Sequence, residues 1–293
     1  MLAPSGIVDA STLGQLVSLF QKVTSSFKTM STGDKLRNGF ESVTSSLGPS
    51  SSADSVIGAF RMGDYQVALK RADGLPKASH DYLFLRGLVL HKLGKLDDAL
   101  MSLDRAAIME GLNKQQIAQN YLGLGMVLRD KGMTDESVLC FEESLKNHPD
   151  QGSYYRAMST AWLLGGIRSA DAVQKAQFSV NLENRLQVSS PDSLNMSLCE
   201  SVSVLAWAHA VNTKDEWEVG KLEREAKALL DITNKPAAGL VYFSFGKAYF
   251  ALGKLAQSSE SFEKAAKVEP QGNYGRWSKE AIEGMPQPAN VAQ

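Results

Sequence analysis

The side chains able to perform acid–base, nucleophilic or metal chemistry are few in this chain of 293 residues, and they lie far apart in the sequence. The histidines and cysteines are His80, His91, His148, His209, Cys140 and Cys199. No pair of them has the spacing of a metal-ligand motif, and neither a paired-carboxylate motif nor the glycine-flanked serine of a hydrolase is present. We therefore expect no catalytic site, no cofactor and no metal, and a protein that is not an enzyme.

A phosphate-binding loop is also excluded. The stretch from Gly87 to Lys95 contains the right residue types, but their spacing is wrong and Leu96 stands where such a loop needs serine or threonine. The two cysteines lie in separate apolar helical patterns, so we expect two buried thiols rather than a disulfide, in a reducing compartment.

The overall charge and the apolar runs exclude further classes. Lysine and arginine total 31 against 32 aspartates and glutamates, a net charge of -1, which gives no general field for holding nucleic acid. No apolar run is long enough to cross a bilayer, and the N-terminus lacks the basic start and apolar core of a secretion signal. The sequence predicts a cytoplasmic protein.

The clearest pattern is a phrase of small and apolar residues that occurs three times with identical internal spacing. Its copies are Gly87, Leu90, Gly94, Ala99, Leu103 and Ala106; Gly125, Leu128, Gly132, Ser137, Phe141 and Ser144; and Gly246, Tyr249, Gly253, Ser258, Phe262 and Ala265. Steps of three, four and seven place these residues on one face of a helix, and the central glycine permits a left-handed turn. We therefore expect antiparallel helical hairpins stacked side by side.

This phrase resembles the tetratricopeptide repeat, a helix-turn-helix unit of about 34 residues. The best match is the unit at 239–272, through Tyr242, Phe245, Gly246, Tyr249, Gly253, Phe262, Ala265 and Pro270. The resemblance covers most of residues 55–272. It implies an all-α helical-hairpin solenoid of about five to six hairpins, forming a right-handed superhelix, here with an N-terminal helical extension.

Three regions are predicted along the chain. Residues 1–50 carry two amphipathic stripes and end in a serine-rich joint, which indicates an N-terminal helical arm. Residues 51–272 form the repeat array, with an irregular pair at 185–235. Residues 273–293 are expected to be a capping helix followed by a disordered tail.

Two units of the array depart from the period. In the degenerate unit at 152–184, the second-helix residues Ala172 and Ala176 come one position late, so we expect the loop to absorb an insertion. In the irregular pair, we expect long helices at 192–212 and 214–231.

The resemblance implies that the first helix of each hairpin lines an inner groove. The residues at its groove positions that we expect to bind a partner are Phe84, Leu88, His91, Lys92, Leu122, Met126, Arg129 and Arg156. Chaperone-binding members of the family hold a terminal carboxylate with lysine and asparagine, but the equivalent positions here are apolar, so that clamp is not expected. An apolar strip with a cationic border suits an apolar or amphipathic segment with acidic edges. The alternative is that these residues pack against the N-terminal helices or against each other.

The sequence therefore predicts a non-catalytic adaptor or scaffold that binds a protein or peptide segment. The N-terminal arm would fill the groove of its own chain or join two chains into a homo-oligomer. Two alternatives stay open: an architectural protein that assembles through the arm or the array ends, and a ligand-sensing regulatory subunit of an enzyme or secretion complex.

Overall fold

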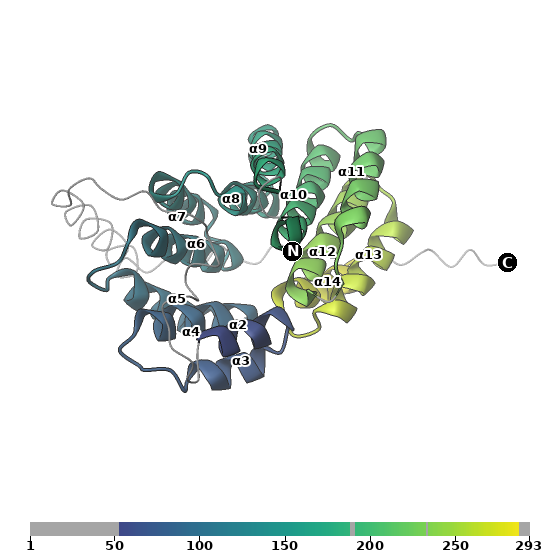
Figure 1. Ribbon diagram of the computed structural model, residues 1–293. Helices are drawn as coiled ribbons and strands as arrows, with labels where there is room; N and C mark the ends of the chain where they lie inside the picture. Colours follow the sequence, from purple (N-terminus) through teal and green to yellow (C-terminus); the bar gives the residue numbers. More distant parts are fainter. Residues whose placement is uncertain (1–52, 188–190, 233, 287–293) are drawn as a thin grey trace.

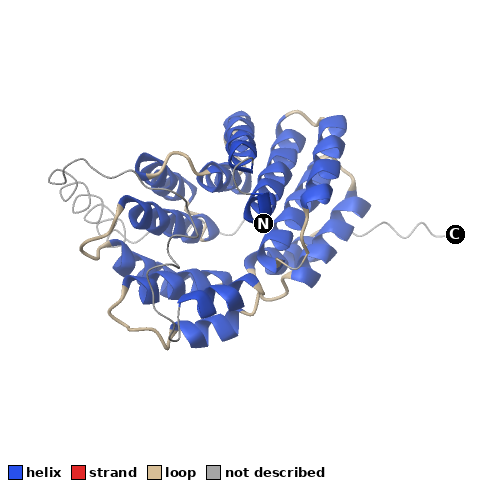
Figure 2. Ribbon diagram, viewed as in Figure 1, coloured by secondary structure: helices blue, strands red, loops and turns tan. Residues whose placement is uncertain are grey.

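The computed structural model describes residues 53–187, 191–232 and 234–286, and over these residues the chain folds into helices without any strand (Figure 2). In chain order they are α2 (Ala53–Arg61), α3 (Tyr65–Ala72), α4 (His80–Lys92), α5 (Leu96–Ala107), α6 (Lys114–Asp130), α7 (Thr134–Asn147), α8 (Gly152–Gly165), α9 (Ser169–Gln187), α10 (Pro191–Asn212), α11 (Glu216–Leu229), α12 (Lys235–Ala251), α13 (Leu255–Val268) and α14 (Asn273–Glu283). The all-α prediction is confirmed. The N-terminal arm and the tail beyond residue 286 lie outside the described residues.

The turn inside a hairpin depends on glycine. The glycines with this role in the regular units, with φ between +73° and +78°, are Gly63, Gly94, Gly132 and Gly253. Only glycine adopts this left-handed backbone without a side-chain penalty. At Gly94, the glycine N–H donates to the carbonyl of His91 at 2.9 Å and the next N–H, that of Lys95, donates to Leu90 at 3.0 Å. These two bonds end the first helix and reverse the chain.

Glycine has a second task where the two helices of a hairpin touch. A Cβ atom built on the glycine would lie 2.6 Å from Leu103 at Gly87, 2.4 Å from Phe141 at Gly125 and 2.5 Å from Phe262 at Gly246. Leu103, Phe141 and Phe262 are each almost fully buried. The repeated glycine therefore leaves the space into which the large side chain of the second helix packs.

The hairpins stack into a row that bends back on itself. The first helices α2, α4, α6, α8, α10 and α12 each contact the next, and α14 continues the same row after α12. Over the described part of the chain, six hairpins are thus followed by a single helix. Figure 1 shows the row curving until the yellow C-terminal helices lie next to the blue N-terminal ones, and hydrogen bonds from α14 to α4 and α6 join the two parts.

The two irregular units follow the sequence pattern closely. The long pair expected at 192–212 and 214–231 is formed by α10 and α11. The expected insertion is present as well: α5 begins two residues after Gly94, whereas α9 begins three residues after Gly166. The loop accommodates the additional residue by placing Arg168 at a φ of +48°, which is a strained conformation for a residue with a large side chain.

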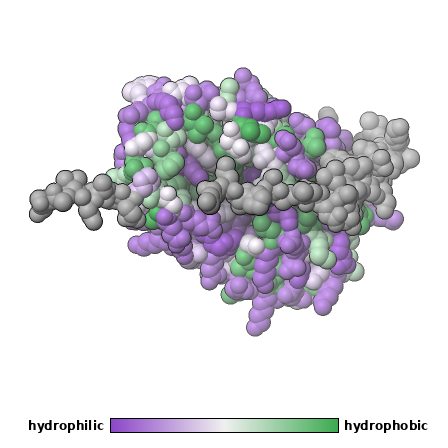
Figure 3. All heavy atoms as spheres, turned by 180° about the vertical axis from the view of Figure 1, so that it is seen from behind, coloured by the Kyte–Doolittle hydropathy of each residue, from purple (hydrophilic) through white to green (hydrophobic). Residues whose placement is uncertain are grey.

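Buried apolar side chains run along the whole array, with the largest cluster reaching from Val138 of α7 to Tyr274 of α14. On the face seen in Figure 3, polar side chains predominate and the apolar ones form scattered patches. Of the helices in the described part of the chain, none combines the length and the apolar character that a bilayer crossing requires.

Candidate functional site on the inner face

The inner face is the side of α4, α6, α8, α12 and α14 that is turned toward the centre of the curved row. Its C-terminal boundary is α14, which packs on α12 and α13 and reaches α4 and α6. The fold-back before α14 is tight, because a Cβ on Gly275 would lie 1.9 Å from the backbone oxygen of Glu269. α14 lies in the region 273–293 where the sequence predicts a capping helix, and it also joins the end of the row to its beginning.

We call the polar contacts at this closure the junction. Its residues are Tyr65, His91, Lys92, Arg129, Asp130, Glu269, Asn273, Tyr274 and Arg276. They come from α3, α4, α6, α14 and the segment before α14. Residues about 200 positions apart in the sequence thus meet in one buried polar layer.

Asp130 is the acceptor at the centre of one half of the junction. His91 Nε2 lies 2.5 Å from its Oδ2, Asn273 Nδ2 donates to the same oxygen at 2.6 Å, and Arg129 Nε donates to Oδ1 at 2.7 Å. Burial alone would raise the pKa of Asp130, but Arg129 and His91 outweigh it and hold the pKa at about 2. Burial, in contrast, lowers the pKa of His91 despite the nearby carboxylate. His91 is therefore a neutral hydrogen-bond donor at pH 7.

Glu269 is the centre of the other half. Its Oε1 accepts hydrogen bonds from the Tyr65 hydroxyl and, at 3.2 Å, from Lys92 Nζ. The carboxylate lies against two glycines, since a Cβ on Gly239 or Gly272 would come within 2.4 Å or 2.2 Å of it. Burial raises the pKa of Glu269 more than Lys92 lowers it. A carboxylate enclosed in this way contributes chiefly by connecting α3 and α4 to the end of α13.

Arg276 completes the junction through backbone groups. Its Nη1 donates to the carbonyls of Lys92 at 2.9 Å and Gln271 at 2.6 Å, and its Nη2 donates to Asn273 Oδ1 at 2.8 Å. A Cβ on Gly94 would lie 2.5 Å from the guanidinium. The turn glycine of the second hairpin thus also makes room for the helix that closes the array.

The junction changes the interpretation of three predicted groove residues. The sequence places His91, Lys92 and Arg129 on a cationic border of the groove, and in the structure α14 and Glu269 contact all three. His91 and Arg129 are buried, and Lys92 is half-buried with its ammonium 4.8 Å from the centre of the Tyr274 ring. The charges that would select acidic edges on a partner are already neutralised within the chain.

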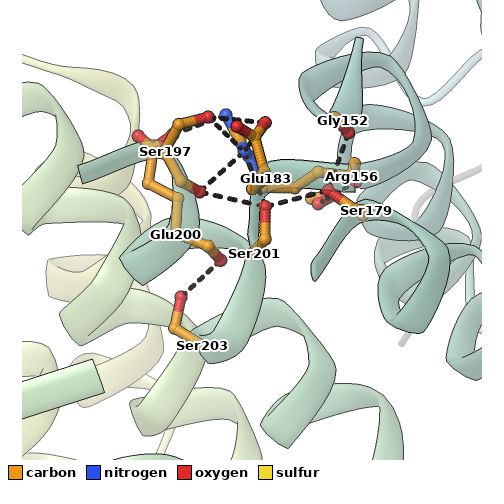
Figure 4. Close-up of polar contacts among 9 residues, drawn as sticks. Gly152, Arg156, Ser179, Glu183, Ser197, Glu200, Ser201 and Ser203 are labelled. Atoms are coloured by element: carbon orange, nitrogen blue, oxygen red, sulfur yellow. Dashed lines mark hydrogen bonds and ion pairs between the residues drawn. The ribbon is translucent and has the colours of Figure 1, made fainter. Parts of the chain in front are cut away.

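Arg156 lies in a separate polar cluster between α8, α9 and α10 (Figure 4). Its Nη2 is 2.5 Å from Glu200, and its Nη1 donates to the Ser201 hydroxyl at 2.8 Å. Ser197 donates to Glu183 at 2.8 Å, and burial raises the pKa of Glu183 more than Arg156 lowers it. Arg156 therefore connects the degenerate unit to the long pair, where the sequence predicts a cation facing the groove.

The four apolar groove residues keep part of their surface exposed. Phe84 and Leu88 of α4 pack against the cluster around Leu103 and Tyr121, and Leu122 and Met126 of α6 pack against the large C-terminal cluster. All four are half-buried, so the described helices neither enclose nor fully expose them. We call Phe84, Leu88, Leu122 and Met126 the apolar strip.

The residues that sequence reasoning misses are the acceptors and donors supplied by the C-terminal segment, Glu269, Asn273 and Arg276. No periodicity distinguishes them from surface residues, because their burial depends on the closure of the whole row. The cysteines are buried as expected, and burial raises the pKa of both thiols to about 12. Among the described residues, no three His, Cys, Asp or Glu side chains converge as metal ligands would.

Comparison with known proteins finds two family models that match this chain and several similar solved structures. One model described as tetratricopeptide repeat matches residues 118–151 and 240–271, and a second with the same description matches residues 55–115. The chain is similar to a tetratricopeptide repeat protein from Parabacteroides merdae, with 14% identity, 78% of this chain and 95% of that chain covered and a TM-score of 0.39. It is also similar to the C-terminal part of a repeat-containing protein from Cytophaga hutchinsonii, with 12% identity, 80% and 100% covered and a TM-score of 0.36.

No curated protein sequence matches the chain. The segments that the two family models match coincide with the hairpins α2–α5, α6–α7 and α12–α13, where the turn glycines and the close helix contacts repeat. These segments of the chain are therefore tetratricopeptide repeats, and the rest of the row continues them with helical hairpins of the same kind.

Proposed function

We propose that the protein is a non-catalytic adaptor that holds an apolar or amphipathic segment of a partner protein against the apolar strip. Tetratricopeptide repeats generally mediate protein–protein interactions, and proteins of this family are typically non-catalytic. The strip supplies Phe84 and Leu88 from one hairpin and Leu122 and Met126 from the next, at neighbouring positions of two packed helices. A partner helix gains affinity by covering such side chains.

The observation that supports this proposal most is the placement of α14. The first turn of this amphipathic helix contacts the C-terminal ends of α4 and α6 through Asn273 and Arg276. The strip occupies the preceding turns of the same two helices. A partner segment on the strip would therefore continue along a surface that already binds one helix.

The test compares capture of a partner by strip variants and by a matched surface variant. Phe84→Asp and Leu122→Asp place a carboxylate in the strip, whereas Leu139→Asp changes an apolar residue of α7 that is 50% exposed. We expect partner proteins captured by the full chain to be lost with the strip variants and kept with Leu139→Asp. Thermal melts of all three variants establish that each one is folded.

A shortened protein that begins at Ala53 is carried through the same experiment, with light scattering to measure molecular mass. If the shortened protein binds a partner more tightly, the N-terminal arm competes for the strip within its own chain. If a dimer of the full chain is lost on shortening, the arm instead joins two chains. A partner retained by both strip variants contradicts the proposed site. A protein that captures no partner at either length contradicts the adaptor function.

A further inference from the structure

Where the row closes, its surface has an open cavity of about 400 Å³ that the proposed adaptor function does not use. It lies where the ends of α6 and α8 meet α12 and α14, and its walls include Leu164, Phe243, Lys247 and Trp277. The apolar strip belongs to the earlier turns of α4 and α6, so the two regions are distinct. The volume is in the range of pockets that bind small molecules.

Four charged side chains line the cavity: Arg129, Asp130 and Lys247, and also Glu280, which is exposed on α14. Arg129 is paired with Asp130, Lys92 with Glu269, and Arg156 with Glu200. Lys247 differs, because within the described residues its Nζ has neither a hydrogen-bond acceptor nor a carboxylate partner. In that part of the chain the ammonium instead faces the ring of Phe243, one turn earlier on α12, at 5.6 Å from the ring centre.

An unpaired ammonium in this position is costly to the folded protein. Lys247 is half-buried, so its ammonium is partly removed from water, and this burial lowers its pKa. A partly desolvated cation gains more from an anionic ligand than a cation on the open surface does. Of the charged residues that line the cavity, Lys247 is therefore the one that gains most from an anionic group placed beside it.

The other walls limit what else the ligand can be. Phe243, Leu164 and Trp277 offer aromatic and aliphatic surface, which fits an apolar body. Glu280 also lines the cavity, and with Asp130 it disfavours a second negative charge on the ligand. We propose that this cavity is a binding site for a small monoanionic carboxylate with an aromatic or aliphatic body, held through Lys247.

The experiment uses the full chain and three probes, phenylacetate, indole-3-acetate and hexanoate, each compared with its neutral amide. Binding is measured by calorimetry and by the shift in melting temperature. We expect at least one carboxylate to bind and its amide to bind more weakly by about 10- to 100-fold, because only the acid forms a charged hydrogen bond with Lys247. Lys247→Met should bind the carboxylate only as weakly as the natural protein binds the amide.

Two variants serve as controls. Lys227→Met removes an exposed lysine of α11 that is paired with Glu223, and it should leave carboxylate binding unchanged. Ala281→Trp fills the cavity from α14 and should abolish binding of acid and amide alike. In the absence of ligand, Lys247→Met should melt at a higher temperature than the natural protein, because it removes a cation without a partner.

Three results would overturn the proposal. They are equal binding of acids and amides, full binding by Lys247→Met, and no binding of any probe at about 10 mM, where even a millimolar Kd is detected. If Lys247→Met fails to fold, the comparison of acid with amide and the Ala281→Trp variant still decide the matter.

Discussion

At the scale of single residues, the junction contains a histidine whose protonation opposes folding. His91 donates to Asp130 as a neutral ring, and Arg129 and Lys92 on either side add positive charge to its surroundings. Its pKa in the folded protein lies below the ordinary value of 6.5, so the unfolded chain binds a proton first as the pH falls. Protonation of His91 therefore favours the unfolded state in this range.

We expect the free energy of unfolding to decrease as the pH is lowered from about 7 to about 5. His91 should contribute up to about 1.4 kcal/mol per pH unit to this decrease. In His91→Gln, whose amide still donates to Asp130, this contribution should be absent. Urea denaturation of both proteins across this pH range measures the difference.

The raised pKa of Glu269 acts in the opposite direction, but it does so in both proteins and cancels in the comparison. His209→Gln controls for the removal of a histidine outside the junction. An identical pH dependence in the natural protein and in His91→Gln would show that His91 is not the titrating group.

At the scale of helices, stability depends on the glycine that lets the two helices of a hairpin approach. Gly125→Ala would place a Cβ 2.4 Å from the ring of Phe141, which is fully enclosed. We expect this substitution to lower the free energy of unfolding by about 1–3 kcal/mol, because the ring or a helix must move. Chemical denaturation of the purified variant measures the loss.

Gly58→Ala is the matched control. Gly58 is also a helical glycine, in α2, but a Cβ built there has no atom within 4 Å. The substitution should therefore raise stability by about 0.5–1 kcal/mol, since alanine favours the helix more than glycine does. Equal effects at both positions would mean that the close contact with Phe141 is not what requires glycine.

The sequence predicts most of the fold at this scale because the signals are local. The turn at Gly94, the boundaries of α10 and α11 and the additional residue before α9 all follow from periodicity and from glycine placement. The candidate site is predicted less well. The pattern places Phe84 and Leu122 on the inner face, but it contains no sign that α14 covers His91 and Arg129.

At the scale of the whole molecule, the burial of His91 and Arg129 beside α14 depends on how the row of helices closes. Each hairpin adds a small rotation to the one before it, and only the sum over six hairpins brings Glu269 to Lys92. No local motif encodes this sum. Glu269 and Asn273 are therefore polar residues of the kind expected at a surface, yet both are buried in the structure.

The ion pair of Lys92 and Glu269 joins the two ends of the row, so its contribution to stability reports on their contact. We expect Lys92→Met and Glu269→Gln each to lower the free energy of unfolding by about 3 kcal/mol, because each leaves one charged or polar partner buried alone. The double variant should lose less than the sum of the two. A double-mutant cycle in urea measures this difference.

The exposed pair of Lys227 and Glu223 on α11 gives the control, since breaking it should cost about 0.5 kcal/mol or less. Strictly additive losses at Lys92 and Glu269 would mean that the two residues do not stabilise the closure together.

Closure also fixes how many repeats the chain can have. An open array tolerates the gain or loss of a unit, because each hairpin contacts only its neighbours. Here the seventh helix of the row returns to the second and third, and Asp130 and Lys92 depend on that return. A duplication of one ~34-residue unit would carry α14 past both partners and leave their charges buried and unpaired. Growth by duplication, the ordinary route by which repeat proteins change length, would therefore be selected against in this chain.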